Sequence, residues 1–167
     1  MKSMTERIPL PAPVDAEIYE FLLKHLSSVQ ENDTPAYHET TSADLTLYEW
    51  WVTPQRIDGL PFHEFMMQSN ASRGSVFGAP ETLPDPASSS VRAATTTRFD
   101  LANLCIQRYS DTAIASYTLL ISTASAQGIK VASHNETRVI VKIDGAWKVV
   151  HVHKSPAYAA PHVDPHA

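Results

Sequence analysis

Glu136-Thr-Arg-Val-Ile-Val-Lys-Ile-Asp-Gly-Ala-Trp-Lys-Val-Val-His-Val-His153 is the stretch that decides the fold. Asp144-Gly145 separates two runs rich in β-branched residues, a pattern that predicts a β-hairpin with a two-residue turn. The turn would place Arg138 opposite His151 and Glu136 opposite His153. Because side chains alternate across a strand, one face of the hairpin would carry all four of these residues. We therefore predict a polar pocket on this face.

The other face of the predicted hairpin is apolar. Its valines are Val139, Val141, Val150 and Val152. A sheet face with so many valines is unusual on a monomer, because large apolar patches mark contact surfaces. The pattern predicts that this face packs against something apolar.

Length and composition narrow the class of protein. A chain of 167 residues, 43% hydrophobic and 19% charged, is typical of one soluble globular domain. A net charge of −5 without a basic stripe argues against a nucleic-acid partner. The single cysteine, Cys105, excludes an internal disulfide, fits a reducing compartment and is expected to be buried in a strand. With no apolar leader or membrane-length apolar run, the sequence predicts a cytoplasmic protein without a membrane partner.

Helical patterns come first along the chain, and strand patterns follow. Apolar residues recur at helical spacing after Asp15, a predicted N-cap, and further short helices are expected at 35–41 and 61–68. Strands are expected at 45–51, 94–109, 112–125, 131–143 and 146–153. This order predicts an α+β fold with the helices on one face of an antiparallel sheet.

The same pass along the chain predicts the domain organisation. A single domain would occupy residues 14–156, preceded by a flexible arm at 1–13 and followed by a disordered tail at 157–167. The Pro, Gly and Ser content of residues 70–90 predicts a mobile loop within the domain.

Three patches between Leu45 and Ser155 resemble the association (hub) domain of calcium/calmodulin-dependent protein kinase II and its stand-alone bacterial relatives, within the nuclear-transport-factor-2-like (SnoaL-like) superfamily. They are Thr46-Leu-Tyr-Glu49 with Ile57-Asp-Gly-Leu-Pro-Phe-His-Glu-Phe65, then Asp111-Thr-Ala-Ile-Ala-Ser-Tyr117, and lastly the Glu136–His153 hairpin. The resemblance implies a cone-shaped curved sheet wrapped around N-terminal helices, with a concave pocket. It also implies a homodimer or higher oligomer formed through the back of the sheet, where the valine face lies.

The resemblance covers no kinase catalytic machinery, since the Gly-rich loop, His-Arg-Asp and Asp-Phe-Gly motifs are missing from this sequence. Kinase activity, calmodulin binding and phosphorylation are therefore not expected. The implied role is a stand-alone oligomerising domain whose pocket holds a small polar or carboxylate ligand.

Arg138 matches the arginine that reaches into the pocket of the hub domain, where a guanidinium can hold a carboxylate by two hydrogen bonds. The alternative is an internal salt bridge to Glu136 or Glu49. His63 and Tyr117 also match pocket positions, and the further lining residues we predict are His151, His153 and Trp50. Two departures from the family pattern are present. Leu119 replaces a second pocket arginine, which weakens anion binding, and Trp50-Trp51 replaces Pro-Glu, where one tryptophan would close the pocket or both would belong to the core or to an interface.

Enzymes of the same superfamily provide alternative functions. A ketosteroid-isomerase-like or polyketide-cyclase-like protein would need a base such as Glu49, His63 or Asp44 in an apolar cone. A metal-free carbonic anhydrase would hold bicarbonate with Tyr117, His151, His153 and Ser155, although two members of its His-His-His-Ser-Ser signature are missing. A metal held by His151 and His153 would need His63 or Glu49 as a third ligand, so structural histidines without metal or another cofactor are favoured.

Overall fold

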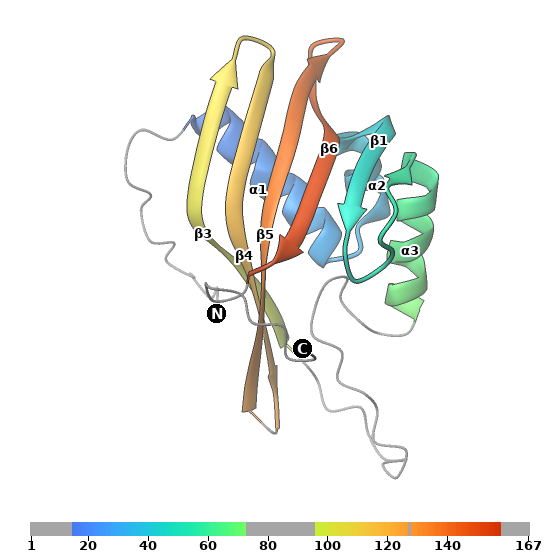
Figure 1. Cartoon of the computed structure of the whole chain (residues 1–167), viewed down its shortest axis with the longest axis vertical. Helices are drawn as coiled ribbons and strands as arrows, with labels where there is room; N and C mark the ends of the chain where they lie inside the picture. Colours follow the sequence, from blue (N-terminus) through green and yellow to red (C-terminus); the bar gives the residue numbers. More distant parts are fainter. Residues whose placement is uncertain (1–14, 73–95, 127, 158–167) are drawn as a thin grey trace, which may run out of the picture.

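Two capped helices open the described part of the chain. The computed structural model describes residues 15–72, 96–126 and 128–157, beginning with α1 (Ala16–Gln30) and α2 (Thr34–Thr40) (Figure 1). Asp15 accepts a hydrogen bond from the Ile18 amide at 3.1 Å, and Asp33 accepts one from the Ala36 amide at 3.1 Å. These carboxylates satisfy N–H groups that the first turn of a helix leaves without partners. The predicted helix start at Asp15 is confirmed.

Six strands form one sheet in the described residues. They are β1 (Thr41–Glu49), β2 (Ile57–Asp58), β3 (Thr96–Tyr109), β4 (Thr112–Ser125), β5 (Gly128–Ile143) and β6 (Ala146–Pro156), in the order β2-β1-β6-β5-β4-β3. The third helix, α3 (Leu60–Ser72), follows β2. The four long strands predicted from the sequence are present. The predicted arm and most of the predicted loop and tail lie outside the described residues.

The sheet is mixed, whereas the sequence predicted an antiparallel one. β1 runs parallel to β6, with Glu49 beside Lys154 and Leu47 beside Val152. Parallel neighbours have to be joined by a long crossover rather than a hairpin, so no turn signal marks this pair in the sequence. β1 also ends at Glu49, and both predicted strand residues Trp50 and Trp51 lie in the turn beyond it.

The turn of the closing hairpin is as predicted, but its register is not. Asp144 and Gly145 have φ angles of 50° and 80°, the positive values that a type I′ turn requires. A β-bulge then shifts the pairing, because Ile140 pairs with Val149 while Val139 pairs with His151. Val150 is the extra residue, and every side chain after it in β6 changes face. The predicted pairing of Arg138 with His151 is therefore wrong: Arg138 pairs with Val152.

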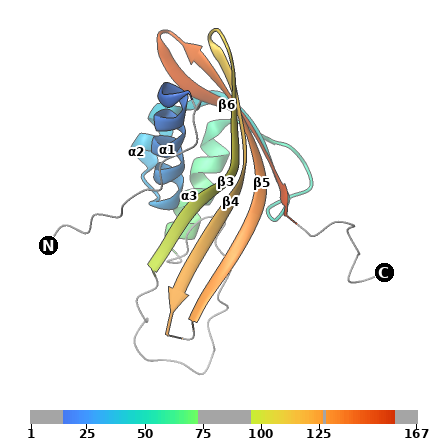
Figure 2. The same cartoon turned by 90° about the vertical axis from the view of Figure 1, so that its left-hand side faces the viewer.

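The described helices α1, α2 and α3 all lie on one face of the curved sheet (Figure 2). The core between the helices and the sheet includes Ile18, Leu22, Leu47, Ile140 and Val149. No described helix lies on the opposite face, which we call the back face. A long β4–β5 ribbon continues beyond the helices (Figure 1). None of the described helices is long and apolar enough to cross a membrane.

Cys105 is exposed, which corrects the prediction that it is buried. It lies in β3, the strand at one edge of the sheet. A register shift between Ala102 and Cys105 places Cys105 opposite Ser116. It therefore lies on the back face, where no described helix covers it.

Candidate functional site

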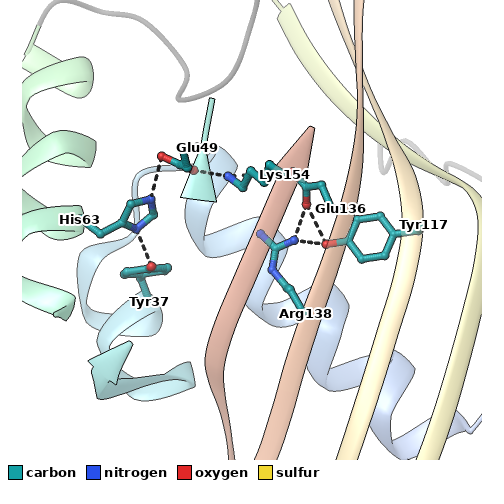
Figure 3. A network of polar contacts seen from close by, with 7 residues as sticks. All are labelled: Tyr37, Glu49, His63, Tyr117, Glu136, Arg138 and Lys154. Carbon is teal, nitrogen blue, oxygen red and sulfur yellow. Dashed lines mark hydrogen bonds and ion pairs between the residues drawn. The ribbon is translucent and has the colours of Figure 1, made fainter. Parts of the chain in front are cut away.

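Between the sheet and the helices lies a row of buried charged side chains (Figure 3). Lys154 donates a hydrogen bond to Glu49, and its Nζ lies 3.9 Å from Glu136 Oε1. Arg138 in turn donates hydrogen bonds to Glu136 and to the Tyr117 hydroxyl. The two carboxylates and the two cations alternate, so their formal charges cancel. We call Glu49, Lys154, Glu136 and Arg138 the charge row.

Strand alternation and the bulge together bring the charge row to the interior. Glu136 and Arg138 lie two residues apart on β5 and point to the same side of the sheet. Lys154 pairs with Glu136 on β5 and with Glu49 on β1, so it lies between the two carboxylates. Without the bulge at Val150, Lys154 would lie on the back face. A single extra residue in β6 therefore completes the charge row.

Glu49 is ionised because its partners outweigh its burial. Burial alone would raise the pKa of the carboxyl, since it removes the charged form from water. The charge of Lys154 and a hydrogen bond from His63 act in the opposite direction, and the pKa falls to about 2. A carboxylate with so low a pKa is a weak general base near neutral pH.

The Glu136–Arg138 pair is likewise charged. Burial alone would raise the pKa of Glu136. The charges of Arg138 and Lys154 lower the pKa by more than burial raises it, so the net shift is downward. Burial lowers the pKa of Arg138, whereas the Glu136 charge raises it above its ordinary value. Burial raises the pKa of Tyr117 well above its ordinary value, so the phenol stays protonated and donates to Glu136 Oε2 at 2.8 Å. The Arg138 guanidinium is thus fixed by its hydrogen bonds to Glu136 and to the Tyr117 hydroxyl.

A tyrosine–histidine pair extends the charge row toward α3. Tyr37 Oη lies 2.5 Å from His63 Nδ1, and His63 Nε2 lies 3.5 Å from Glu49 Oε2. Burial, reinforced by the Glu49 charge, raises the pKa of Tyr37, so its hydroxyl is protonated and can donate to Nδ1. In that arrangement the proton of a neutral His63 ring is on Nε2, which faces the Glu49 carboxylate. Both rings are buried, at 2% and 3% exposure.

A small hollow adjoins the charge row. It has room for roughly one water molecule. Its walls are formed by the polar residues Gln30, His134, Glu136, Arg138 and Lys154 and by Leu26, Val29, Trp51, Leu119 and Ile121. The polar wall includes buried atoms that make no hydrogen bond within the described chain, among them Gln30 Oε1, Glu136 Oε1 and Arg138 Nε.

The sequence profile of the calcium/calmodulin dependent protein kinase II association domain matches residues 14–76 and 90–158 of this chain. The chain belongs to this family. The structure of the S. rosetta CaMKII hub has 25% sequence identity and a TM-score of 0.64, over 89% of this chain and 100% of that chain. This association domain therefore has the fold and the family that its sequence patches indicated.

Other solved structures are similar in fold. The Chlamydamonas reinhardtii CamKII hub homology domain has 21% identity and a TM-score of 0.65, over 86% of this chain and 98% of that chain. A putative ketosteroid isomerase from Shewanella frigidimarina has 17% identity and a TM-score of 0.61, over 84% of this chain and 96% of that chain. An NTF2-like superfamily protein from Salmonella enterica has 16% identity and a TM-score of 0.58, over 87% of this chain and 92% of that chain, so it shares the fold.

Several of the predicted site residues come together in the interior. Arg138, Tyr117, Glu49 and His63 all belong to the connected network in Figure 3. Of these four, only Arg138 lines the hollow. The salt bridge between Arg138 and Glu136, named above as the alternative to ligand contact, is present.

Other predicted lining residues lie elsewhere. His151 and His153 lie on the back face because the bulge turns them away from the interior. Trp50 is 44% exposed in the turn after β1, and its neighbour Trp51 lines the hollow instead. Trp51 stacks on His134 with ring centroids 5.0 Å apart, and Lys154 Nζ lies 5.0 Å from the Trp51 ring.

Two residue sets considered for alternative chemistries are divided between the faces. Tyr117 points inward, whereas His151 and His153 point outward, so the bicarbonate-binding set does not converge. The same division separates the two histidines from His63 and Glu49, the possible third metal ligands. Within the described ranges, no three His, Cys, Asp or Glu side chains are placed to hold a metal ion.

The sequence analysis missed two members of the network, Lys154 and Tyr37. Strict alternation through Val150 and Val152 places Lys154 on the apolar face, so nothing in the hairpin pattern indicated it. Tyr37 lies in α2, a seven-residue helix too short for a reliable periodic pattern. The signal that could have indicated Lys154 is Glu49, because a carboxylate buried in the interior needs a cation beside it.

Proposed function

We propose that this association domain is a self-association module that pairs through the back face. The observation that carries the proposal is the asymmetry of the sheet, whose helices all lie on one side (Figure 2). The back face holds half-buried apolar side chains, namely Ile114, Leu120, Val139, Val141 and Val150. Water contact with such a patch is unfavourable, and a second copy would remove it. The association-domain name of the family supports the same role.

The apolar patch on the back face differs from the valine face that the sequence predicted. Val139, Val141 and Val150 are on it, but Val152 is 4% exposed and belongs to the core. The bulge at Val150 causes this exchange, because it brings His151 and His153 to the back face in place of Val152. The proposed contact surface therefore combines valines with a polar edge.

Val139→Glu is expected to convert the protein to a monomer, and Val150→Glu should act similarly. A carboxylate buried without a partner in an apolar interface costs about 2–5 kcal/mol, which raises the dissociation constant at least about 30-fold. Light scattering at several protein concentrations measures the mass. Val139→Thr is the matched control, because it keeps the shape without adding a charge. A native mass for both glutamate variants would refute back-face pairing.

We infer a second role, the binding of a small carboxylate by Arg138. The support is the Arg138 Nε donor, which lacks a hydrogen-bond partner among the described residues, beside the hollow that Arg138 lines. The hollow is too small for an organic ligand while Glu136 occupies the guanidinium. A ligand carboxylate would therefore have to take the place of Glu136 on Arg138, with apolar Leu119 as part of the wall.

Glu136→Gln is expected to strengthen carboxylate binding, because it removes the internal competitor for Arg138 while keeping a side chain of similar shape. Acetate should then raise the melting temperature of this variant more than that of the native protein. Chloride at equal ionic strength corrects for general salt effects. The double variant Glu136→Gln/Arg138→Gln should lose the acetate effect. Equal acetate responses in all three proteins would rule out Arg138 as the binding group.

An acid–base enzyme is less well supported by the geometry. Neither Glu49 nor His63 lines the hollow, and Glu49 is paired with Lys154. Its low pKa favours a structural carboxylate over a catalytic base. We therefore place self-association first and carboxylate binding second.

A further inference from the structure

The two histidines that the bulge moves to the back face form a titratable cluster at its edge. His151 Nδ1 lies 2.8 Å from Thr46 Oγ1 on β1. Tyr48 packs against both imidazoles, with ring centroids 6.4 Å from His151 and 5.1 Å from His153. His151 is half-buried and His153 is exposed. Imidazole is the side chain whose charge changes between pH 5 and 8.

Apolar or neutral residues surround this cluster on β5. Val139 pairs with His151, and Thr137 pairs with His153. Val139 belongs to the proposed contact surface, so His151 lies directly beside the region that a second copy would cover. A covered imidazole can remain neutral at little cost, whereas a covered imidazolium without a partner is unfavourable.

The charges near the cluster do not compensate a positive imidazole. Arg56, on the segment before β2, acts on His151 as a like charge. Asp58 is the nearby carboxylate, and it is already paired with Arg56 at 2.6 Å. Neither His151 nor His153 forms an ion pair with any residue that the structure describes. Protonation would therefore add positive charge beside an existing cation.

On the basis of the self-association proposed above, we propose that His151 and His153 make back-face pairing sensitive to pH. The two copies pair while the imidazoles are neutral, and they separate when protons bind. This property would make the contact surface reversible within the range in which histidine titrates. The partner remains a second copy of this chain.

The direction of the effect follows from proton linkage. Burial, followed by the charges of His153 and Arg56, already lowers the pKa of His151 in the single subunit. Covering the face would lower it further, so the pair would bind fewer protons than two free subunits. Pairing is then fully favourable above the free-subunit pKa and weakens as the pH falls below it. One proton taken up per copy raises the dissociation constant about 100-fold per pH unit in the limit.

Sedimentation velocity at pH 7.5, 6.5 and 5.5 tests the proposal, at constant ionic strength and in buffers without carboxylates. We expect the dissociation constant of the native protein to rise at least about tenfold between pH 7.5 and 5.5. The double variant His151→Gln/His153→Gln retains polar side chains but cannot be protonated, and it should stay paired at pH 5.5. Far-UV circular dichroism checks that both proteins remain folded.

His38→Gln is the matched control, since His38 is an exposed histidine on α2, away from the back face, and this variant should respond to pH as the native protein does. A native protein that is monomeric at pH 7.5 would refute the self-association itself. A native protein that is paired at every pH would refute the pH effect alone. Dissociation of the double-glutamine variant at pH 5.5 to the native extent would assign the effect to other groups and overturn the proposal.

Discussion

Lys154→Met is expected to lower the free energy of unfolding by about 3–5 kcal/mol, the usual cost of removing one partner from a buried ion pair. Lys154 is 5% exposed and is bonded to Glu49, which is fully buried. Methionine fills a similar volume, so the loss reports the missing charge rather than a cavity. Urea unfolding at fixed protein concentration, followed by circular dichroism near pH 7, measures the difference.

Two further variants isolate the cause of this loss. Lys24→Met removes an ion pair of 2.8 Å to Glu39, but both side chains are exposed, so the change should stay below about 0.5 kcal/mol. Lys154→Met/Glu49→Gln removes both charges and should recover part of the stability lost in the single variant. If Lys154→Met unfolds at the same urea concentration as Lys24→Met, the charge row does not stabilise the fold.

The second large effect is expected on acidification. Burial opposes the charge of Glu49, but Lys154 and His63 bring its pKa from 4.5 down to about 2. The folded state then binds fewer protons than the unfolded state between these two values. The contribution of ionised Glu49 to the free energy of unfolding is therefore fully present above about pH 4.5 and is lost as the pH falls toward 2. The full difference is about 3 kcal/mol.

Urea midpoints measured from pH 6 to pH 3 test this dependence. Glu49→Gln cannot titrate at this position, so its stability at pH 6 should be lower and should fall less steeply with acid. Glu136, whose pKa is also lowered, leaves some dependence in this variant. The exposed Glu39→Gln is the control and should follow the native curve. Parallel curves for Glu49→Gln and the native protein would show that Glu49 is not the titrating group.

The sequence was sufficient to predict the layers of the fold. Local signals carry that information: the helical spacing after Asp15, the Asp144-Gly145 turn and the succession of long β-branched strands. Each of these signals depends on residues that are close together along the chain. Strand alternation then assigns the side chains of the hairpin to its two faces. Arg138, Tyr117, Glu49 and His63 lie in the interior, but the family resemblance rather than these local signals singled out Tyr117 and His63, and ligand binding by these residues stays a prediction.

The bulge at Val150 could not be predicted from the sequence. Val149-Val150 continues the β-branched run without a glycine or another residue that marks an irregularity. The prediction consequently placed His151 and His153 inside and Lys154 outside, the reverse of their positions. The effect of the bulge becomes clear only from the neighbouring strands. The bulge brings Lys154 between Glu49 on β1 and Glu136 on β5.

The parallel pairing of β1 with β6 has a consequence for biosynthesis. Glu49 leaves the ribosome long before Lys154, since the two residues are 105 positions apart. A nascent chain that lacks β6 has a carboxylate bound for the interior and no cation to neutralise it, so closure of the interior is unfavourable at that stage. Pairing between such distant segments is also slow, because a long stretch of chain has to be closed into a loop first. Burial of an ionised Glu49 is therefore expected to follow the synthesis of β6, which supplies Lys154.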